Sequence, residues 1–181
     1  MLKRQLLCAI LLLVISLPLA AQSEQYGVPV NSDTAKKAAA AAVAEARKNN
    51  FTMAIAIVDP NGTLVYFEKM DNTQNGSAAV AIDKARSAAL FKRPTKAFQD
   101  TLAAGGDGLR ILALQGAVPV DGGIPIIVGG KIIGAVGASG GTSAQDGQVA
   151  RAGADAVKQA EADSLTSISP LCVLSVSVVN R

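Results

Sequence analysis

The stretch that decides the fold is IPIIVGGKIIGAVGA, residues 124–138. Two apolar segments, 124–128 and 131–138, flank the dipeptide Gly129-Gly130, and a Gly-Gly pair between two such segments is typical of a β-hairpin. Small residues follow at 140–143, and a helix is expected from about Ala144 to Ala162. Ser143, with Asp146 three residues later, resembles a capping box at its start. This half of the chain therefore predicts a hairpin followed by a helix.

The N-terminal half predicts a second hairpin between two helices. Segments 52–58 and 63–70 flank the turn Asp59-Pro60-Asn61-Gly62. The alanine-rich stretch 34–48 predicts a helix before this hairpin. After it, apolar residues recur at helical spacing from Ala78 to Ala89, behind a possible cap at Ser77. Lys84 and Arg86 are expected on the exposed side of that second helix.

The segment between the second helix and the glycine-rich hairpin is harder to assign. A short helix is expected over 96–103, a flexible loop over 105–108, and a β-like segment from Leu109, interrupted by Pro119. The resulting order of elements predicts an α+β fold. We expect an antiparallel sheet of about five strands with helices packed against it.

The composition excludes several classes of protein. The 181 residues include 17 Lys+Arg and 14 Asp+Glu, a net charge of +3, and only 3% aromatic residues. That balance does not suit a nucleic-acid-binding protein. The absence of histidine excludes His-dependent catalytic triads and the commonest metal and haem ligand. Two cysteines are too few for a zinc site or a disulfide framework.

Residues 1–21 have the layout of a secretory signal. Lys3 and Arg4 precede the apolar run 6–19, and small residues follow it. We therefore expect a signal peptide over 1–21, a domain over 22–163 and a C-terminal tail over 164–181, in a periplasmic or secreted bacterial protein. An uncleaved anchor is the alternative, but the run is shorter than the roughly 20 residues of a membrane helix. The apolar tail segment 171–179 is also too short to span a membrane, and is a strand, a docked segment or disordered.

The glycines mark one candidate site. More than half of the 17 glycines lie between Gly122 and Gly147. Glycine lets a ligand approach main-chain N–H groups closely. Segment 134–143 runs from a strand into a helix start, where N–H groups and the helix dipole suit a carboxylate or a phosphate. Tight turns and close packing of a helix on the sheet are the alternative explanation.

Other candidates also have two interpretations. Lys84 and Arg86, with Lys92 and Arg93 at the end of the same helix, are either solvated or available to ligand carboxylates. Asp121 forms either an Asx turn or a buried base. Tyr66, like the nearby methionines, either packs in the core or ligates a haem iron.

Several motifs, in this order, resemble the GlcG/HbpS-like family over about residues 31–163. They are Val58-Asp59-Pro60-Asn61-Gly62, Pro94-Thr95, Asp121-Gly122-Gly123-Ile124-Pro125-Ile126, the stretch 133–141, Gln145-Asp146 and Ala150-Arg151-Ala152-Gly153-Ala154. The resemblance implies a profilin-like α+β domain that forms homo-oligomers. Some members of the family bind haem, and others occur in catabolic operons.

Together with the predicted signal and the composition, the resemblance implies an exported protein that binds a small ligand, with haem as the leading candidate cofactor, no nucleic-acid partner and no stable membrane span after signal cleavage. With the candidates above, the expected binding residues are Lys84, Arg86, Tyr66, Asp121, Gly122, Gly123, Pro125 and Thr142. Where relatives use a histidine, the iron ligand here would be Tyr66, a methionine or Thr142. The alternative is an accessory enzyme that acts on a small organic acid, with Asp121, Lys84, Arg151 and Tyr66 as its candidate groups. A purely structural protein is the third possibility.

Overall fold

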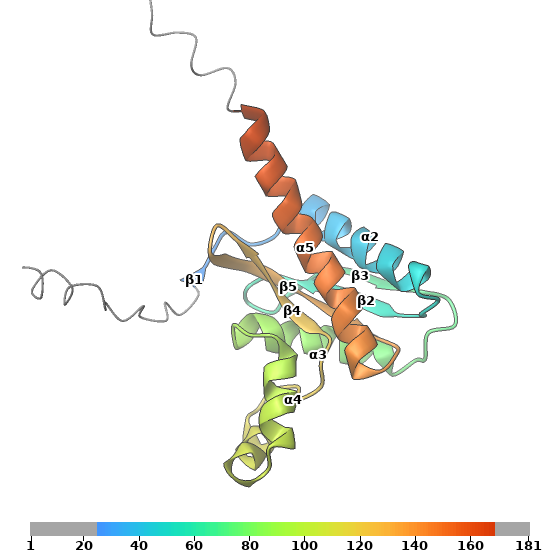
Figure 1. Ribbon diagram of the computed structural model, residues 1–181, viewed down its shortest axis with the longest axis vertical. Coiled ribbons are helices and arrows are strands. Elements are labelled where there is room, and N and C mark those ends of the chain that lie inside the picture. Colours follow the sequence, from blue (N-terminus) through green and yellow to red (C-terminus); the bar gives the residue numbers. More distant parts are fainter. Residues whose placement is uncertain (1–24, 169–181) are drawn as a thin grey trace, which may run out of the picture.

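The hairpin at residues 124–138 lies within a five-stranded sheet in this computed structural model, which describes residues 25–168 (Figure 1). The elements follow the order β1 (Gln25–Tyr26), α2 (Ser32–Lys48), β2 (Ala54–Val58), β3 (Leu64–Lys69), α3 (Ser77–Leu90), α4 (Thr95–Ala103), the 3-10 helix η1 (Gly106–Ala113), β4 (Gly123–Val128), β5 (Lys131–Ser139) and α5 (Ser143–Ile168). The predicted α+β class is confirmed, as are both hairpins.

Strand β5 organises the sheet. It pairs antiparallel with β4 along one side, with Ile124 opposite Val136. Along its other side it pairs antiparallel with β2, which in turn pairs antiparallel with β3. The short β1 runs parallel to the start of β5, where Gln25 lies opposite Lys131. β4 is therefore an edge strand, a position that tolerates Pro125, which has no N–H to donate to a neighbour.

Helices cover both faces of the sheet. Alternate residues of a strand point to opposite faces. Ile55, Ile57 and Val136 pack in one cluster with buried residues of α2 and α5. Ala54, Ala56 and Ala135 pack in a second cluster with the alanine face of α3. Figure 1 shows α5 in front of the sheet with α2 alongside it, and α3 behind the strands. The sheet thus separates α3 from α5.

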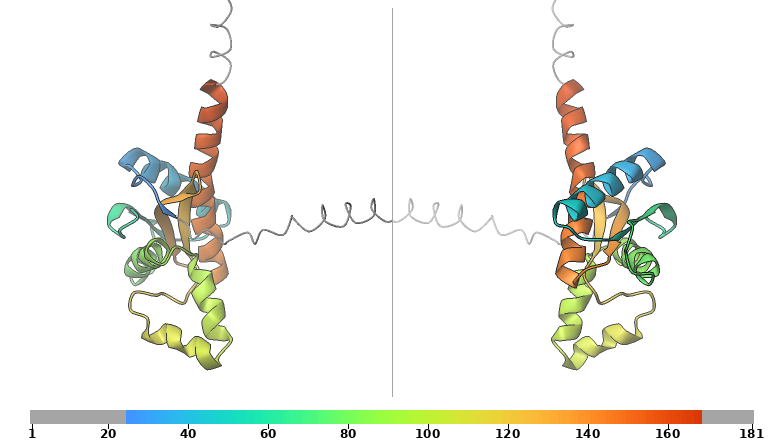
Figure 2. Two further views of the ribbon diagram at one scale, coloured as in Figure 1. Left: turned by 90° about the vertical axis from the view of Figure 1, so that its left-hand side faces the viewer. Right: turned by 90° about the vertical axis from the view of Figure 1, so that its right-hand side faces the viewer.

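The segment from α4 through η1 projects away from the sheet as an arm (Figure 2). The predicted strand from Leu109 is wrong, because this segment forms the 3-10 helix η1 and then a loop. Three leucines of this segment are exposed: Leu109, Leu112 and Leu114. A strand needs a neighbouring strand, and none of the described strands pairs with this segment. The fifth strand of the sheet is instead β1, from a segment to which we assigned no element.

Several helix ends also differ from the predictions. α3 begins at Ser77 itself, and the predicted cap by its side chain is wrong because no side-chain hydrogen bond caps this helix. α2 begins at Ser32, because the Asn31 side chain accepts a hydrogen bond from the Thr34 N–H at 2.8 Å. α5 continues to Ile168, so it enters the segment assigned to a tail. The predicted signal peptide, segment 171–179 and Cys172 lie outside the described residues. Within 25–168, none of the helices is long and apolar enough to cross a bilayer.

A prediction concerns the contact between β5 and α3. Gly137 faces α3, and a Cβ there would overlap the carbonyl oxygen of Ala81 and crowd the N–H of Ala85 at 2.7 Å. We expect Gly137→Ala to lower the free energy of unfolding by about 1–3 kcal/mol or more, because two backbones must separate. The matched control is Gly76→Ala, whose added Cβ has no neighbour within 4 Å. Equal urea midpoints for the two variants would contradict this packing.

Candidate functional site

A buried ion pair connects the two helix layers. Lys84 of α3 donates to Asp146 Oδ2 of α5 at 2.7 Å, and its Nζ also lies 3.4 Å from the carbonyl oxygen of Ala138. Lys84 is 1% exposed and Asp146 is 3% exposed. The prediction that Lys84 is exposed is therefore wrong. Lys84 follows Ala81 by three residues and precedes Ala88 by four, so helical spacing places it on the buried face of α3.

Glycines make room for this pair. A Cβ at Gly122 would lie 2.9 Å from Lys84 Nζ and 2.8 Å from Asp146 Cβ. Gly122 also has a φ of +125°, which a residue with a side chain rarely adopts. The bend at 121–123 therefore needs glycine for packing and for backbone geometry, independently of any ligand.

Four main-chain N–H groups of this region already have acceptors. Asp146 Oδ1 accepts from the Gly141 N–H, and Gln145 Oε1 accepts from the Thr142 N–H, both at 2.9 Å. Asp121 Oδ1 accepts from the Gly122 N–H at 2.7 Å, and Thr95 Oγ1 accepts from the Gly123 N–H at 2.9 Å. The expectation of open N–H groups awaiting an anion is wrong at these four positions, where side chains of the chain itself accept the hydrogen bonds. The alternative explanation, turns and close packing, is the one the structure supports.

The eight predicted binding residues do not form one site. Lys84, Asp121, Gly122 and Gly123 meet at the buried junction just described. Arg86 is exposed and donates to the Gly62 carbonyl oxygen at 3.1 Å. Thr142 is exposed at the start of α5. Pro125, on the edge strand β4, lines a separate hollow described below.

Tyr66 lies on β3, at the opposite edge of the sheet from β4. Its hydroxyl donates to Glu68 Oε2 at 3.3 Å. Partial burial, followed by the negative charge of Glu68, raises the pKa of Tyr66 above its usual value. The raised pKa disfavours the deprotonated form of the phenol, and this opposes its use as a tyrosinate ligand.

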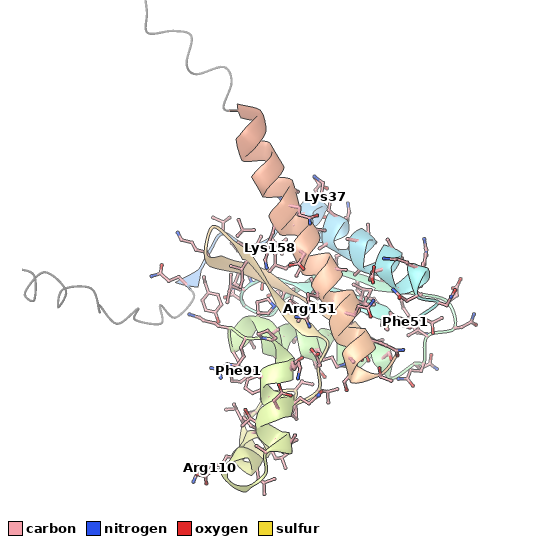
Figure 3. All side chains as sticks on the ribbon, in the orientation of Figure 1. Lys37, Phe51, Phe91, Arg110, Arg151 and Lys158 are labelled. Carbon is pink, nitrogen blue, oxygen red and sulfur yellow. The ribbon has the colours of Figure 1, made fainter. Side chains whose placement is uncertain are left out.

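The cationic hollow is a surface depression of about 280 Å³ at the outer edge of β4. Its aliphatic part is formed by Pro94, Ile124, Pro125 and Ile127, and its charged part by Lys92, Arg93, Arg151, Asp155 and Lys158. Three elements build it: the turn between α3 and α4, strand β4 and helix α5. Figure 3 shows Arg151 and Lys158 along the side of α5 that borders the β4–β5 hairpin.

The cations of the hollow are held in different ways. Lys92 stacks on the Tyr26 ring at 4.4 Å from the centroid, and Arg93 stacks on the Phe98 ring at 5.5 Å. Lys158 pairs with Asp155 at 3.3 Å. Arg151 has no hydrogen-bond or ion-pair partner among the described residues. Four cations and one carboxylate beside aliphatic side chains suit a ligand that is both apolar and anionic.

Only part of this hollow could be predicted from the sequence. Lys92 and Arg93 have two interpretations there, as solvated cations or as partners for ligand carboxylates, and Pro125 is one of the expected binding residues. Arg151 is a candidate group only for the alternative enzyme, and Lys158 is not among the candidates. The available signal was the spacing of seven residues between Arg151 and Lys158, which places both on one face of a helix.

A second hollow, of about 360 Å³, lies near Gly27–Asn31 and includes Lys131 as its one cation.

The buried ion pair generates a stability prediction. Lys84→Met leaves the Asp146 carboxylate buried without its cation, and we expect the free energy of unfolding to fall by about 3–5 kcal/mol. Asp146→Asn keeps an acceptor for the Gly141 N–H. In the double variant the losses should be less than additive by about 1 kcal/mol or more. Urea unfolding measures all three.

The matched control for this cycle is the exposed pair Lys96–Asp100, also at 2.7 Å, whose side chains are 51% and 60% exposed. Lys96→Met should cost no more than about 1 kcal/mol, because exposed ion pairs contribute little. A Lys84→Met variant as stable as Lys96→Met would show that the junction does not hold the layers together.

Comparisons with known proteins agree with this architecture. GlcG of Escherichia coli K12 is 39% identical over 100 residues, which cover 55% of this chain and 73% of GlcG. The structure of a double mutant of HbpS from Streptomyces reticuli matches with a TM-score of 0.66 and 29% identity, over 77% of this chain and 96% of that one. A structure of PduOC in complex with haem matches with a TM-score of 0.64 and 27% identity, over 71% and 95%. The family model described as "Haem degrading protein HbpS-like" matches residues 30–155, and the chain therefore belongs to the HbpS-like family.

Proposed function

We propose that this protein binds haem or a closely related tetrapyrrole at the cationic hollow. The observation that carries the proposal is the arrangement of four cations around the aliphatic edge of β4. Haem has the matching chemistry, since it joins a flat apolar ring to two carboxylates. Membership of a family described by haem degradation, and the likeness to a haem complex of PduOC, support the same ligand.

In this proposal the two parts of the hollow have separate roles. The macrocycle packs on the half-buried Ile127, above the buried Ile124 and Pro125, and removal of its own apolar surface from water supplies most of the affinity. The propionates are bound by Arg151 and Lys158 on one side or by Arg93 on the other. A hollow of about 280 Å³ covers part of the ring, so the rest faces solvent or another protein surface.

The alternative of an enzyme acting on a small organic acid receives less support. Of its four candidate groups, Lys84 is 1% exposed and Asp121 is 4% exposed. Tyr66 lies at the far edge of the sheet, and Arg151 lies on the surface of α5. Acid–base catalysis requires such groups within hydrogen-bond reach of one substrate. Their separation favours a binding protein.

Export and self-association are further parts of the proposal. The basic start and apolar run of residues 1–21 support cleavage of a signal peptide and a periplasmic or secreted location. Mass spectrometry of the protein from its native host would define the N-terminus.

The exposed leucines of the α4–η1 arm support a homo-oligomer, because exposed apolar patches often mark protein interfaces.

The test of the binding site is a haemin titration of the wild type and of Arg151→Glu. We expect wild-type binding near one equivalent and an affinity lower by about tenfold in the variant, because a repulsive carboxylate replaces a cation that binds a propionate. Changes in the Soret band and equilibrium dialysis both measure the affinity.

The matched control is Arg110→Glu on η1, where the side chain is 81% exposed and lies outside the hollow. It makes the same change of net charge, so its affinity should stay within about twofold of the wild type. Circular dichroism verifies that both variants fold. If the two variants lose affinity equally, the ligand does not bind at the cationic hollow, and if the wild type does not bind haemin, the proposed function fails.

A further inference from the structure

We propose that the cationic hollow recognises the ring and the carboxylates of a tetrapyrrole but not its metal, so that metal-free porphyrins bind as well as haem. This inference rests on the proposed function and specifies its ligand class. It follows from which side chains line the hollow and from what those side chains can donate or accept.

The side chains of the hollow suit carboxylates rather than iron. Proteins hold haem iron through histidine, a cysteine thiolate, methionine or tyrosine. The residues that line the described hollow are aliphatic or cationic, apart from Asp155, and the Asp155 carboxylate is paired with Lys158 at 3.3 Å. The whole chain contains no histidine, so a second copy of it would not supply one either.

Tyr26 is the tyrosine beside the hollow, and its hydroxyl is engaged elsewhere. The phenol donates toward the carbonyl oxygens of Ala89 and Leu90, at 3.1 Å from each, and so caps the end of α3. Its ring lies under the ammonium group of Lys92. In this position Tyr26 fixes Lys92 at the edge of the hollow, and ligation of iron would break the cap.

The other described candidates for iron ligation lie away from the hollow. Tyr66 is on β3, at the opposite edge of the sheet, and hydrogen-bonds to Glu68. Met53 is fully buried just before β2, and Met70 packs against the cluster formed by α2 and α5. Thr142, the remaining predicted ligand, uses its Oγ1 to accept from the Gln145 N–H at 3.4 Å.

The charged groups, by contrast, are placed for the carboxylates. Arg151 has no partner among the described residues, and it lies on the same side of α5 as Lys158 (Figure 3). Arg93 approaches from the turn between α3 and α4. An anionic ligand that places its carboxylates among these groups gains charge-assisted hydrogen bonds. Neither this gain nor the burial of the ring depends on the metal.

The experiment compares three ligands with the wild-type protein: haemin, protoporphyrin IX and protoporphyrin IX dimethyl ester. We expect protoporphyrin IX to bind within about threefold of haemin. The ester keeps the ring but has no carboxylates, and it should bind about tenfold or more weakly than the free acid. Porphyrin fluorescence and equilibrium dialysis measure the affinities. Tyr26→Phe and Tyr66→Phe are expected to leave the haemin Soret spectrum unchanged.

The outcomes separate this inference from the proposed function. Haemin binding without protoporphyrin binding overturns the inference and leaves haem binding intact. A Soret spectrum that changes in either tyrosine variant, while the fold is retained, also overturns it, because a phenolate then ligates the iron. Equal affinity for the ester and the free acid also overturns the inference, because the cations then do not recognise the carboxylates. If neither haemin nor protoporphyrin binds, the proposed function itself fails.

Discussion

The ion pair between Lys84 and Asp146 joins two layers that the sheet holds apart. α3 packs on one face of the sheet and α5 on the other, and the pair connects them beside the bend at 121–123. A charge in that position is costly unless it is paired and hydrogen-bonded. Lys84 meets both requirements through Asp146 and the carbonyl oxygen of Ala138. The pair therefore fixes where α5 begins, and with it the side of α5 that borders the hollow.

Much of the fold could be predicted because its signals are local. Gly129-Gly130 and the turn at 59–62 are short-range determinants of hairpins, and the alanine-rich helices follow from intrinsic propensity. The prediction of a strand from Leu109 was wrong for the opposite reason. Its apolar residues suggest a strand, but a strand needs a neighbour to accept its hydrogen bonds. No local signal shows that β5 pairs instead with Gln25–Tyr26.

The candidate site was less predictable, because its parts come together only in three dimensions. Lys84 is expected on the exposed side because it does not belong to the apolar stripe that runs from Ala78 to Ala89, and its carboxylate partner is distant in sequence. The glycine-rich segment does require its glycines, but it requires them for packing and backbone geometry rather than for anion binding. The cationic hollow combines residues near 93, 125 and 151, which are brought together by the β4–β5 hairpin and by α5. One sequence does not reveal such a long-range combination.

The chain uses its cations for two different purposes, and burial distinguishes them. Lys84 is fully buried and its charge is neutralised within the protein, so it is not available to a ligand and its contribution is to stability. Arg151 is exposed and unpaired among the described residues, so its contribution to stability is small and its charge is available to an anion. A ligand recognised by such surface cations needs no metal bond. Under the proposed function, this family member without histidine therefore keeps the fold and binds the organic part of its ligand.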